Sequence, residues 1–285
     1  MKKILATSFF CLSSLILSAF DWPQKEILSD SFYSYFGQLR GNTISSSLIF
    51  SESGLVKSCN SGRILAVISE HSEGDFFEST LGNAVILSHD DNMLTVYANL
   101  DGSNVDELLK TDSVASGMTL GNVGTSGWQE GEGCLEFQVV DTKNCNFINP
   151  RVLMPRIGNE LDLSIKNVTA VSRAGTSFNL GTQKTLTSGV YSLYKERQDT
   201  AVPYKTDVFI NGASVESISY DTIVEKNGKL CLKGKKFYPV ESVYPDDNRQ
   251  LLGEITIPRG KDEITIVISD ILGKERFITY TIDVR

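Results

Sequence analysis

Cys134 and Glu136 are the two residues whose types and spacing are best suited to chemistry. They stand one residue apart at the start of a run that continues to Val139 as an apolar strand, and alternate residues of a strand point to the same face of a sheet. A thiolate and a carboxylate on one face are suitable metal ligands, and a thiol is a nucleophile when a base lies nearby. The sequence nominates no such base, so we expect Cys134 to be buried or disulfide-bonded.

The chain has two histidines, His71 and His89. His89 ends an apolar run and is followed by Asp90-Asp91-Asn92, a polar sequence typical of a hairpin turn. Neither histidine is placed at metal-ligand spacing from a second ligand. We therefore expect turn or hydrogen-bonding roles for both histidines.

The elements that would position these residues follow one another in a recognisable order. Residues 36–50, FGQLRGNTISSSLIF, precede strand and turn patterns at Val56–Val67, Gly82–His89, Thr95–Leu100, Val114–Gly127, Cys134–Val139 and Asn149-Pro150. In this order and at these spacings, residues 33–155 resemble the lysostaphin-type (LytM-type) peptidoglycan zinc metalloendopeptidases. The resemblance implies their duplicated hybrid motif fold, with a core of antiparallel β-sheet.

The resemblance also assigns the functional positions, and most of them are changed. The places of the zinc ligands carry Ser45, Ile49 and Glu136, and the places of the catalytic imidazoles carry Asn99 and Cys134. A hydrolytic zinc site needs about three ligands with lone pairs and an open position for water. Ile49 has no lone pair, a neutral serine hydroxyl binds zinc weakly, and Asn99 cannot exchange a proton near neutral pH. We expect no catalytic residue, no metal site and no cofactor, with zinc present only if this interpretation of the lost ligands is wrong.

After about Pro155 the pattern changes to short alternating strands such as Glu263–Ile268, separated by turn signals such as Asn211-Gly212. This pattern predicts a β-sandwich. Residues 268–273 followed by Phe277–Ile282 resemble the last hairpin of an immunoglobulin-like module. The strongest helical candidate in the chain is the short stretch Val105–Lys110. We expect an all-β protein with a LytM-type domain at residues 20–155 and an immunoglobulin-like sandwich at residues 156–285.

The first 19 residues predict export. Met1-Lys2-Lys3 is a short basic region, and Ile4–Phe20 is apolar with interspersed serines, a pattern typical of a secretory signal peptide cleaved near Ala19. The apolar run is short and rich in hydroxyls for a membrane anchor. We expect secretion across the inner membrane, no transmembrane span after removal of the signal, and a location in the periplasm or cell envelope.

Composition limits the partners. Net charge is −8 with dispersed acidic residues, which argues against a nucleic-acid binder because such proteins carry a basic patch. Removal of the signal leaves four cysteines, Cys59, Cys134, Cys145 and Cys231. They allow three full pairings that sequence cannot choose among, although Cys134 with Cys145 would be the easiest to close.

Three functions are compatible with this sequence. The first is a non-catalytic envelope protein that binds peptidoglycan or regulates a cell-wall hydrolase such as an amidase, which is the one we favour. The second is an active zinc endopeptidase with unusual ligands. The third is a structural exported β-sandwich module that uses the first domain as a spacer.

Overall fold

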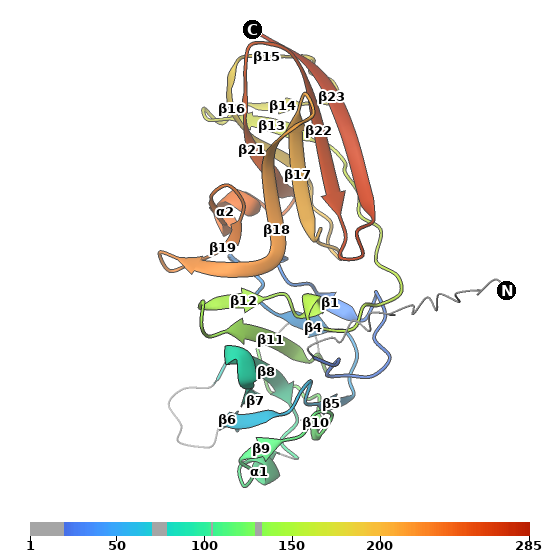
Figure 1. Ribbon diagram of the computed structural model, residues 1–285, viewed down its shortest axis with the longest axis vertical. Coiled ribbons are helices and arrows are strands. Elements are labelled where there is room, and N and C mark those ends of the chain that lie inside the picture. The colour runs from blue at the N-terminus through green and yellow to red at the C-terminus, as the bar shows by residue number, and fades with distance from the viewer. Residues whose placement is uncertain (1–19, 70–78, 104, 129–132) are drawn as a thin grey trace, which may run out of the picture.

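A computed structural model describes residues 20–69, 79–103, 105–128 and 133–285. The predicted signal peptide, residues 1–19, and His71 lie outside the described residues. The molecule is elongated and consists almost entirely of strands (Figure 1). Every strand pair of the described chain is antiparallel except the short pairing of Thr185–Leu186 with Asp283–Val284. The all-β fold class predicted from the sequence is confirmed.

The first half is a set of short strands. The strands are β1 (Phe32–Ser34), β2 (Leu39–Arg40), β3 (Thr43–Ile44), β4 (Leu48–Phe50), β5 (Leu55–Lys57), β6 (Gly62–Ile68), β7 (Asn83–Ser88), β8 (Met93–Leu100), β9 (Ser113–Val114), β10 (Thr119–Asn122), β11 (Glu136–Asp141) and β12 (Asn146–Ile148). Its helical pieces are α1 (Val105–Leu108) and the single turns η1 (Asp90–Asn92) and η2 (Pro150–Val152). α1 falls within the stretch predicted as the best helical candidate.

The second half has longer strands. They are β13 (Thr169–Ser172), β14 (Ser177–Asn179), β15 (Thr185–Leu186), β16 (Gly189–Glu196), β17 (Lys205–Ile210), β18 (Ala213–Lys226), β19 (Lys229–Lys233), β20 (Phe237–Pro239), β21 (Arg249–Ile257), β22 (Gly260–Ser269) and β23 (Glu275–Val284), with the helix α2 (Val240–Val243) between β20 and β21. The predicted turns are present, since Asn211 and Asn227 both have positive φ and precede glycines.

One large sheet runs through both halves of the molecule. Its strand order is β15-β23-β22-β17-β18-β12-β11-β8-β7-β6-β9, and the two halves meet where β12 pairs with the long, bent strand β18 (Figure 1). A second sheet, β14-β13-β16-β21, packs against the upper part of the first. The second half therefore contains a two-layer sandwich, and its assignment to the immunoglobulin-like type stays a prediction.

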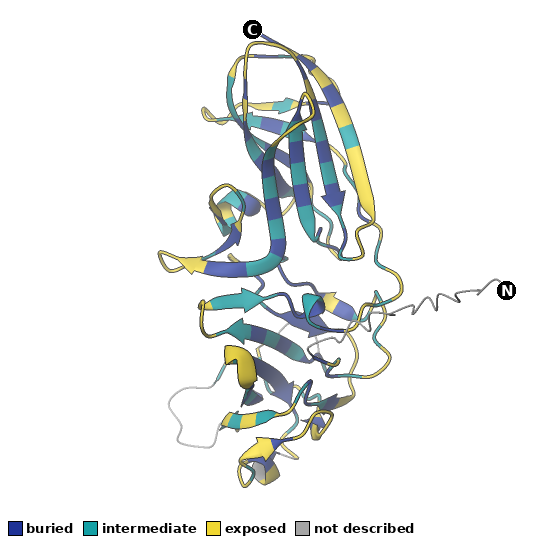
Figure 2. Cartoon of the chain, viewed as in Figure 1, coloured by how far each residue is buried: buried dark blue, intermediate teal, exposed yellow. Residues whose placement is uncertain are grey.

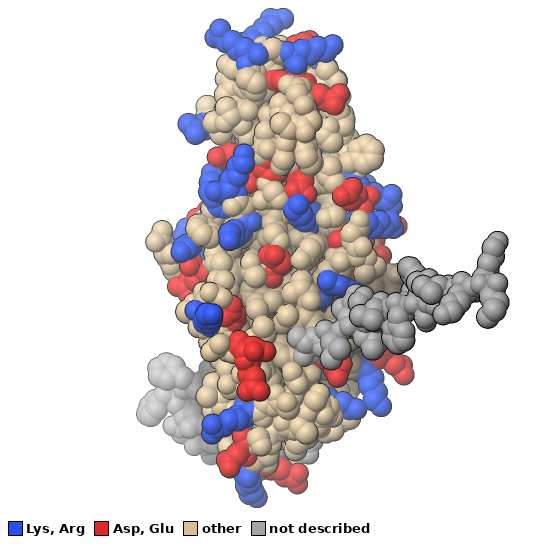
Figure 3. Space-filling model, in the orientation of Figure 1, with Lys and Arg blue, Asp and Glu red and all other residues tan. Residues whose placement is uncertain are grey.

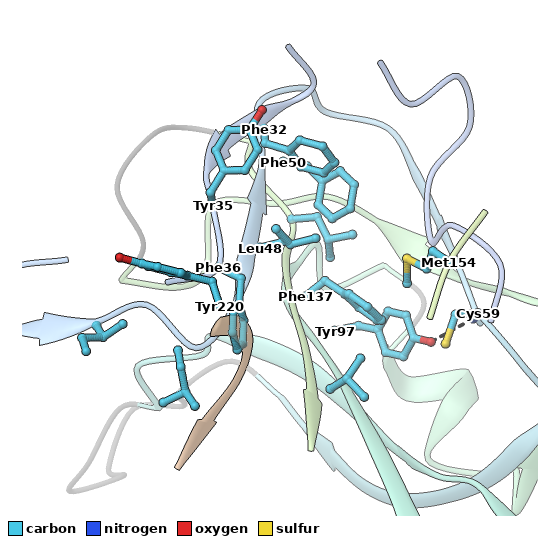
Figure 4. Close-up of a cluster of buried hydrophobic side chains, with 14 of the residues drawn as sticks. Phe32, Tyr35, Phe36, Leu48, Phe50, Cys59, Tyr97, Phe137, Met154 and Tyr220 are labelled. Atoms are coloured by element: carbon cyan, nitrogen blue, oxygen red, sulfur yellow. Dashed lines mark hydrogen bonds between the residues drawn. The ribbon is translucent and has the colours of Figure 1, made fainter. Parts of the chain in front are cut away.

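The larger hydrophobic core also crosses from one half to the other. Phe36 and Phe137 of the first half share this core with Tyr220 and Leu232 of the second, and Figure 4 shows Tyr220 beside Phe36. A separate core fills the sandwich between its two sheets, for example with Leu193, and buried positions alternate with partly exposed ones along its strands (Figure 2). The proposed domain boundary near residue 155 stays a prediction, and the two halves are packed as one body around a shared core.

Cys134 and Cys145, the pair that would be easiest to close by sequence, are not joined. Cys134 precedes β11 and Cys145 precedes β12, so the length of β11 lies between them. A six-residue strand spans about 20 Å, and a disulfide needs Cα atoms within about 7 Å. No disulfide joins any of the four described cysteines, of which only Cys145 is exposed.

The surface carries mixed charge. Lysine and arginine side chains alternate with aspartate and glutamate over the face shown in Figure 3, with no large field of one sign. This agrees with the dispersed acidic residues of the sequence. Among the helices that the structure describes, none is long and apolar enough to cross a membrane.

Lys195 of β16 is only 1% exposed. Its Nζ donates to the Glu196 carbonyl oxygen, and burial lowers the pKa of Lys195 to about 8. Because the unfolded chain keeps this proton up to about pH 10, the unfolded state binds more protons than the native state between pH 8 and 10. The contribution of Lys195 to stability should therefore rise over that window.

We expect Lys195 to contribute a rise of about 2 kcal/mol in the free energy of unfolding from pH 8 to pH 10. The buried thiols of Cys59, Cys134 and Cys231, whose pKa values burial raises, contribute in the opposite direction. Lys195→Met should remove most of the rise due to Lys195 and should stabilise the protein at pH 7. Urea unfolding at several pH values measures both effects. The stability advantage of Lys195→Met over the unsubstituted protein should shrink from pH 8 to pH 10, and an advantage that stays constant would contradict a lowered pKa for Lys195.

Candidate functional site

The predicted site residues come together where β4 meets β11. Ile49 and Glu136 are Cα partners in the antiparallel ladder between these strands, so their side chains lie next to each other on one face of the sheet. The alternation in β11 sends Phe137 and Val139 into the core and leaves Glu136 and Gln138 on the other face. The sequence prediction that Ile49 and Glu136 share one site is therefore consistent with the fold.

Arg40 holds the carboxylate of Glu136 with both arms of its guanidinium. Nη1 donates to Oε1 at 2.7 Å and Nη2 donates to Oε2 at 3.2 Å. The Ser47 hydroxyl donates to the same Oε1 at 2.8 Å. The Glu136 side chain is 12% exposed and that of Arg40 is 31% exposed. A bidentate pair of this kind fixes the carboxylate in charge and in orientation.

Ser45 and Ile49 contribute no free ligand to this place. The Ser45 hydroxyl donates to the Ser47 carbonyl oxygen at 3.2 Å, in a buried position. Ile49 is 1% exposed. Ser45 donates to the backbone of Ser47, and the Ser47 hydroxyl donates to Glu136. Both hydroxyl groups are therefore hydrogen-bonded within the chain.

Asn99 has a structural role at the end of β8. It adopts a positive φ of 64°, a conformation that asparagine tolerates better than most residues. Its Nδ2 donates to the Cys134 carbonyl oxygen at 2.8 Å, and its Oδ1 accepts from the Gly127 amide at 2.8 Å. Asn99 therefore connects the turn that precedes β11 with the loop at Gly127.

Cys134 is buried, as the sequence led us to expect, and is 3% exposed. Burial raises the pKa of the Cys134 thiol, which opposes formation of the reactive thiolate. The neighbouring Asn99 amide contacts the Cys134 carbonyl oxygen and cannot act as a base for the thiol. The pair therefore fits a packed turn and does not fit proton transfer.

These residues do not fit a zinc ion. Of the three positions assigned to ligands, Ile49 has no donor atom, Ser45 uses its proton within the chain, and Glu136 is neutralised by Arg40. A metal would have to displace a guanidinium whose positive charge repels it. Within the described parts of the chain, no other group of three His, Cys, Asp or Glu side chains is placed to hold a metal.

The sequence analysis missed Arg40 and Ser47. Arg40 comes from the hairpin of β2 and β3, where Leu39 pairs with Ile44 and Arg40 with Thr43. The available signal was the acidic residue Glu136 next to the apolar positions of its strand, because a partly buried carboxylate needs a cation or donors around it. Its partner lies 96 residues away in the sequence, so spacing alone could not identify it.

The second half of the chain fixes the base of this hairpin. The Tyr244 hydroxyl donates to the Gly37 carbonyl oxygen at 2.7 Å in a buried position. Gln250 donates to the hydroxyls of both Tyr220 and Tyr244. Gly37 packs so closely on the Tyr220 ring that an added Cβ would lie 2.6 Å from it. The position of Arg40 thus depends on contacts between the two halves.

His89 has the hydrogen-bonding role predicted for it. Its Nδ1 lies 2.8 Å from the Ser61 carbonyl oxygen and its Nε2 lies 2.7 Å from the Thr95 hydroxyl. The ring also packs on Phe20 at a centroid distance of 5.1 Å. Both ring nitrogens are engaged, and His89 takes no part in the site around Glu136.

Substitution of Arg40 tests the pair directly. Arg40→Ala leaves a partly buried carboxylate with one hydroxyl partner, so we expect a loss of about 1–2 kcal/mol in the free energy of unfolding. In the Glu136→Gln background the same substitution should cost about 1 kcal/mol less. A double-mutant cycle by urea unfolding measures this coupling, and a coupling of zero would contradict the pair.

Comparison with known proteins gives two family matches and one related sequence. Residues 47–150 match the model of peptidase family M23, and residues 162–285 match a second family model that carries no description of function. A protein of Treponema pallidum (strain Nichols), described as uncharacterized, is 35% identical over 121 residues, which cover 39% of this chain and 80% of that protein.

Two solved structures are also similar. One is a zinc-containing peptidase from Vibrio cholerae, with 19% identity, a TM-score of 0.31 and coverage of 42% of this chain and 33% of the peptidase. The chain thus spans a third of the length of that peptidase. The other is Pseudoalterin, an M23 metalloprotease from the deep sea, with 14% identity, a TM-score of 0.31 and coverage of 78% of this chain and 98% of that protein.

Proposed function

Because the chain belongs to peptidase family M23 through residues 47–150, we propose that it is a non-catalytic, exported member of that family. It binds peptidoglycan in the cell envelope through the groove beside Arg40 and Glu136. The observation that carries this proposal is the bidentate contact of Arg40 with Glu136, at a position that the family resemblance assigns to a metal ligand.

The loss of catalysis follows from the chemistry of the four other positions. Hydrolysis of a peptide bond by this family's route needs a Lewis acid and a group that moves a proton. Ser45 and Ile49 offer no charged ligand, Asn99 cannot act as an acid or base, and the Cys134 thiol is held neutral by burial. Each of these residues has a packing or hydrogen-bonding role that leaves the scaffold intact.

A groove of about 530 Å³ lies next to the pair and supports a binding role. Its volume is within the range of ligand sites. The first half supplies Tyr33, Arg40 and Ile49, and the second half supplies Arg197, Asp199 and Thr200. An aromatic side chain that is 46% exposed beside fixed charges of both signs suits a polar, peptide-bearing polymer.

Co-sedimentation with purified sacculi tests the proposal. Residues 20–285 should pellet with the insoluble wall, and Thr200→Trp, which fills the groove, should lower the bound fraction at least several-fold. Phe237→Ala is the matched control, because Phe237 is an exposed aromatic residue outside this groove. Equal bound fractions for Thr200→Trp and the control would show that the wall does not bind in this groove.

Regulation of a cell-wall hydrolase is the second candidate and uses the same groove. Activation of a purified amidase by the unsubstituted protein, lost with Thr200→Trp and without any binding to sacculi, would favour it. The third hypothesis, in which the first half serves only as a spacer, is disfavoured because residues of both halves form the core and line the groove.

A further inference from the structure

Strand β23 is an edge strand with little on its outer side. It pairs with β22 along ten residues, from Glu275 to Val284, without a register shift. On its other side β15 pairs only with Asp283 and Val284. The stretch 275–281 thus lacks a strand on its outer side within the described chain.

The backbone groups that face outward can be identified from the short β15 pairing. The amides of Asp283 and Arg285 donate outward, to the carbonyls of Lys184 and Leu186. Because hydrogen-bonding direction alternates along a strand, the outward groups of the open stretch belong to Glu275, Phe277, Thr279 and Thr281. No backbone hydrogen bond from the described residues reaches them on this side.

The segment before β13 does not close this edge. Its residue Asp162 reaches β23 through side chains alone, with Oδ1 accepting from Lys274 Nζ at 2.6 Å and from Arg276 Nη2 at 3.3 Å. These contacts lie at the beginning of the strand. Beyond Arg276 no described strand covers this edge until β15, and exposed positions alternate with buried ones along that part of β23 (Figure 2).

Natural edge strands are usually protected by lysine, proline or a bulge. Residues 277–281, FITYT, contain no charge and no proline, and their register is regular. Phe277 is 73% exposed, more than any other large apolar residue of the described chain. This combination marks a strand that pairs with another strand rather than one that is protected from pairing.

We propose that β23 is the interface between two copies of this chain, joined as an antiparallel ladder about a two-fold axis at Phe277. In this register Phe277 faces its own copy, and Glu275 faces Thr279 of the second molecule. The most exposed aromatic side chains then cover each other on the outer face of the joined sheet, as cross-strand aromatic pairs do.

Charge selects this register over its neighbours. An axis at Glu275 or at Arg276 would place like charges directly opposite each other. An axis at Thr279 would place Glu275 opposite Asp283, whose outer side is already occupied by β15. An axis at Ile278 would set Glu275 diagonal to Asp283 and leave Phe277 opposite threonine. The axis at Phe277 places no like charges directly opposite each other, sets Glu275 opposite Thr279 and pairs the two Phe277 side chains; its like-charge contact is the diagonal between the two Arg276 side chains.

Sedimentation velocity of residues 20–285 tests the interface. The unsubstituted protein should shift from monomer to dimer as its concentration rises. Phe277→Lys, which sets two charges opposite each other, should stay monomeric over the same range, as should Thr279→Pro, which removes an outward amide. Phe237→Lys, at another exposed phenylalanine, should dimerise normally. A monomer at all concentrations, or a dimer unaffected by Phe277→Lys and Thr279→Pro, would overturn the proposal.

Cross-linking tests the register. In a Cys145→Ser background, which removes the one exposed thiol, Phe277→Cys should oxidise to a disulfide-linked dimer. Directly opposite residues of a hydrogen-bonded pair have Cα atoms about 5.5 Å apart, which suits a disulfide. Thr281→Cys, on the same face but opposite Gly273, should not cross-link. Equal cross-linking of both variants would overturn the register. This interface is independent of the proposed wall binding and survives its failure.

Discussion

Replacement of Asn99 by alanine should lower the free energy of unfolding by about 4 kcal/mol. The substitution removes two buried hydrogen bonds, to the Gly127 amide and to the Cys134 carbonyl, each of which costs about 1–2 kcal/mol when its partner is left unsatisfied. It also forces alanine into a positive φ of 64°, which costs about 1–2 kcal/mol. Urea unfolding of the two proteins measures the difference.

Asn99→Gly is the matched control for the backbone conformation. Glycine adopts positive φ freely, so this variant loses only the hydrogen bonds and should cost about 2–3 kcal/mol. The alanine variant should therefore be less stable than the glycine variant. If both variants unfold like the parent, Asn99 does not hold the two loops together and lacks the structural role assigned to it here.

Gly37→Ala should destabilise the protein by about 3 kcal/mol. Its φ is +85°, and the added Cβ would lie 2.6 Å from the Tyr220 ring, a fully buried side chain of the second half. Backbone strain contributes about 1–2 kcal/mol, and overpacking against the ring contributes a similar amount. Thermal or urea unfolding measures the sum.

Gly41→Ala separates these two contributions. Gly41 lies in the same segment with a φ of +55°, and nothing stands within 4 Å of its added Cβ. We expect it to cost only about 1 kcal/mol, from the backbone conformation alone. Equal costs for the two alanines would mean that Gly37 does not press on Tyr220 and that the two halves are less closely joined than the shared core indicates.

Part of the candidate site was predictable from the resemblance of short segments to the family's motifs. Ser45, Ile49, Asn99, Cys134 and Glu136 were identified by their positions in recognisable segments, and the fold brings Ile49 next to Glu136. Apolar and polar residues alternate along strands of these segments such as β11 and β8, and this alternation was enough to predict an all-β chain.

The partners of these residues were not predictable in the same way. The Arg40–Glu136 pair and the Tyr244–Gly37 hydrogen bond join residues 96 and 207 positions apart. Such contacts depend on how β2, β3 and the second half pack in three dimensions, which local pattern does not encode. For the same reason the sequence could not choose among the cysteine pairings: Cys134 and Cys145 are close in the chain but lie at opposite ends of β11.

The continuity of the two halves was also hidden. Changes in strand length and turn composition near Pro155 suggested separate domains, yet β12 pairs with β18 and one core includes residues from both sides. A sequence pattern records the length and amphipathicity of each strand. It does not record which strand pairs with which, and the pairing of β12 with β18 is what joins the two halves.

The central claim is that Arg40 and Glu136 stand where active relatives bind zinc and that the site takes no metal. Elemental mass spectrometry of purified residues 20–285, dialysed against trace zinc, tests it most directly. We expect zinc at background, both in the unsubstituted protein and in Arg40→Ala, because Ser45 and Ile49 remain poor ligands. One mole of tightly bound zinc per mole of unsubstituted protein would contradict the account and would point to an active endopeptidase with unusual ligands.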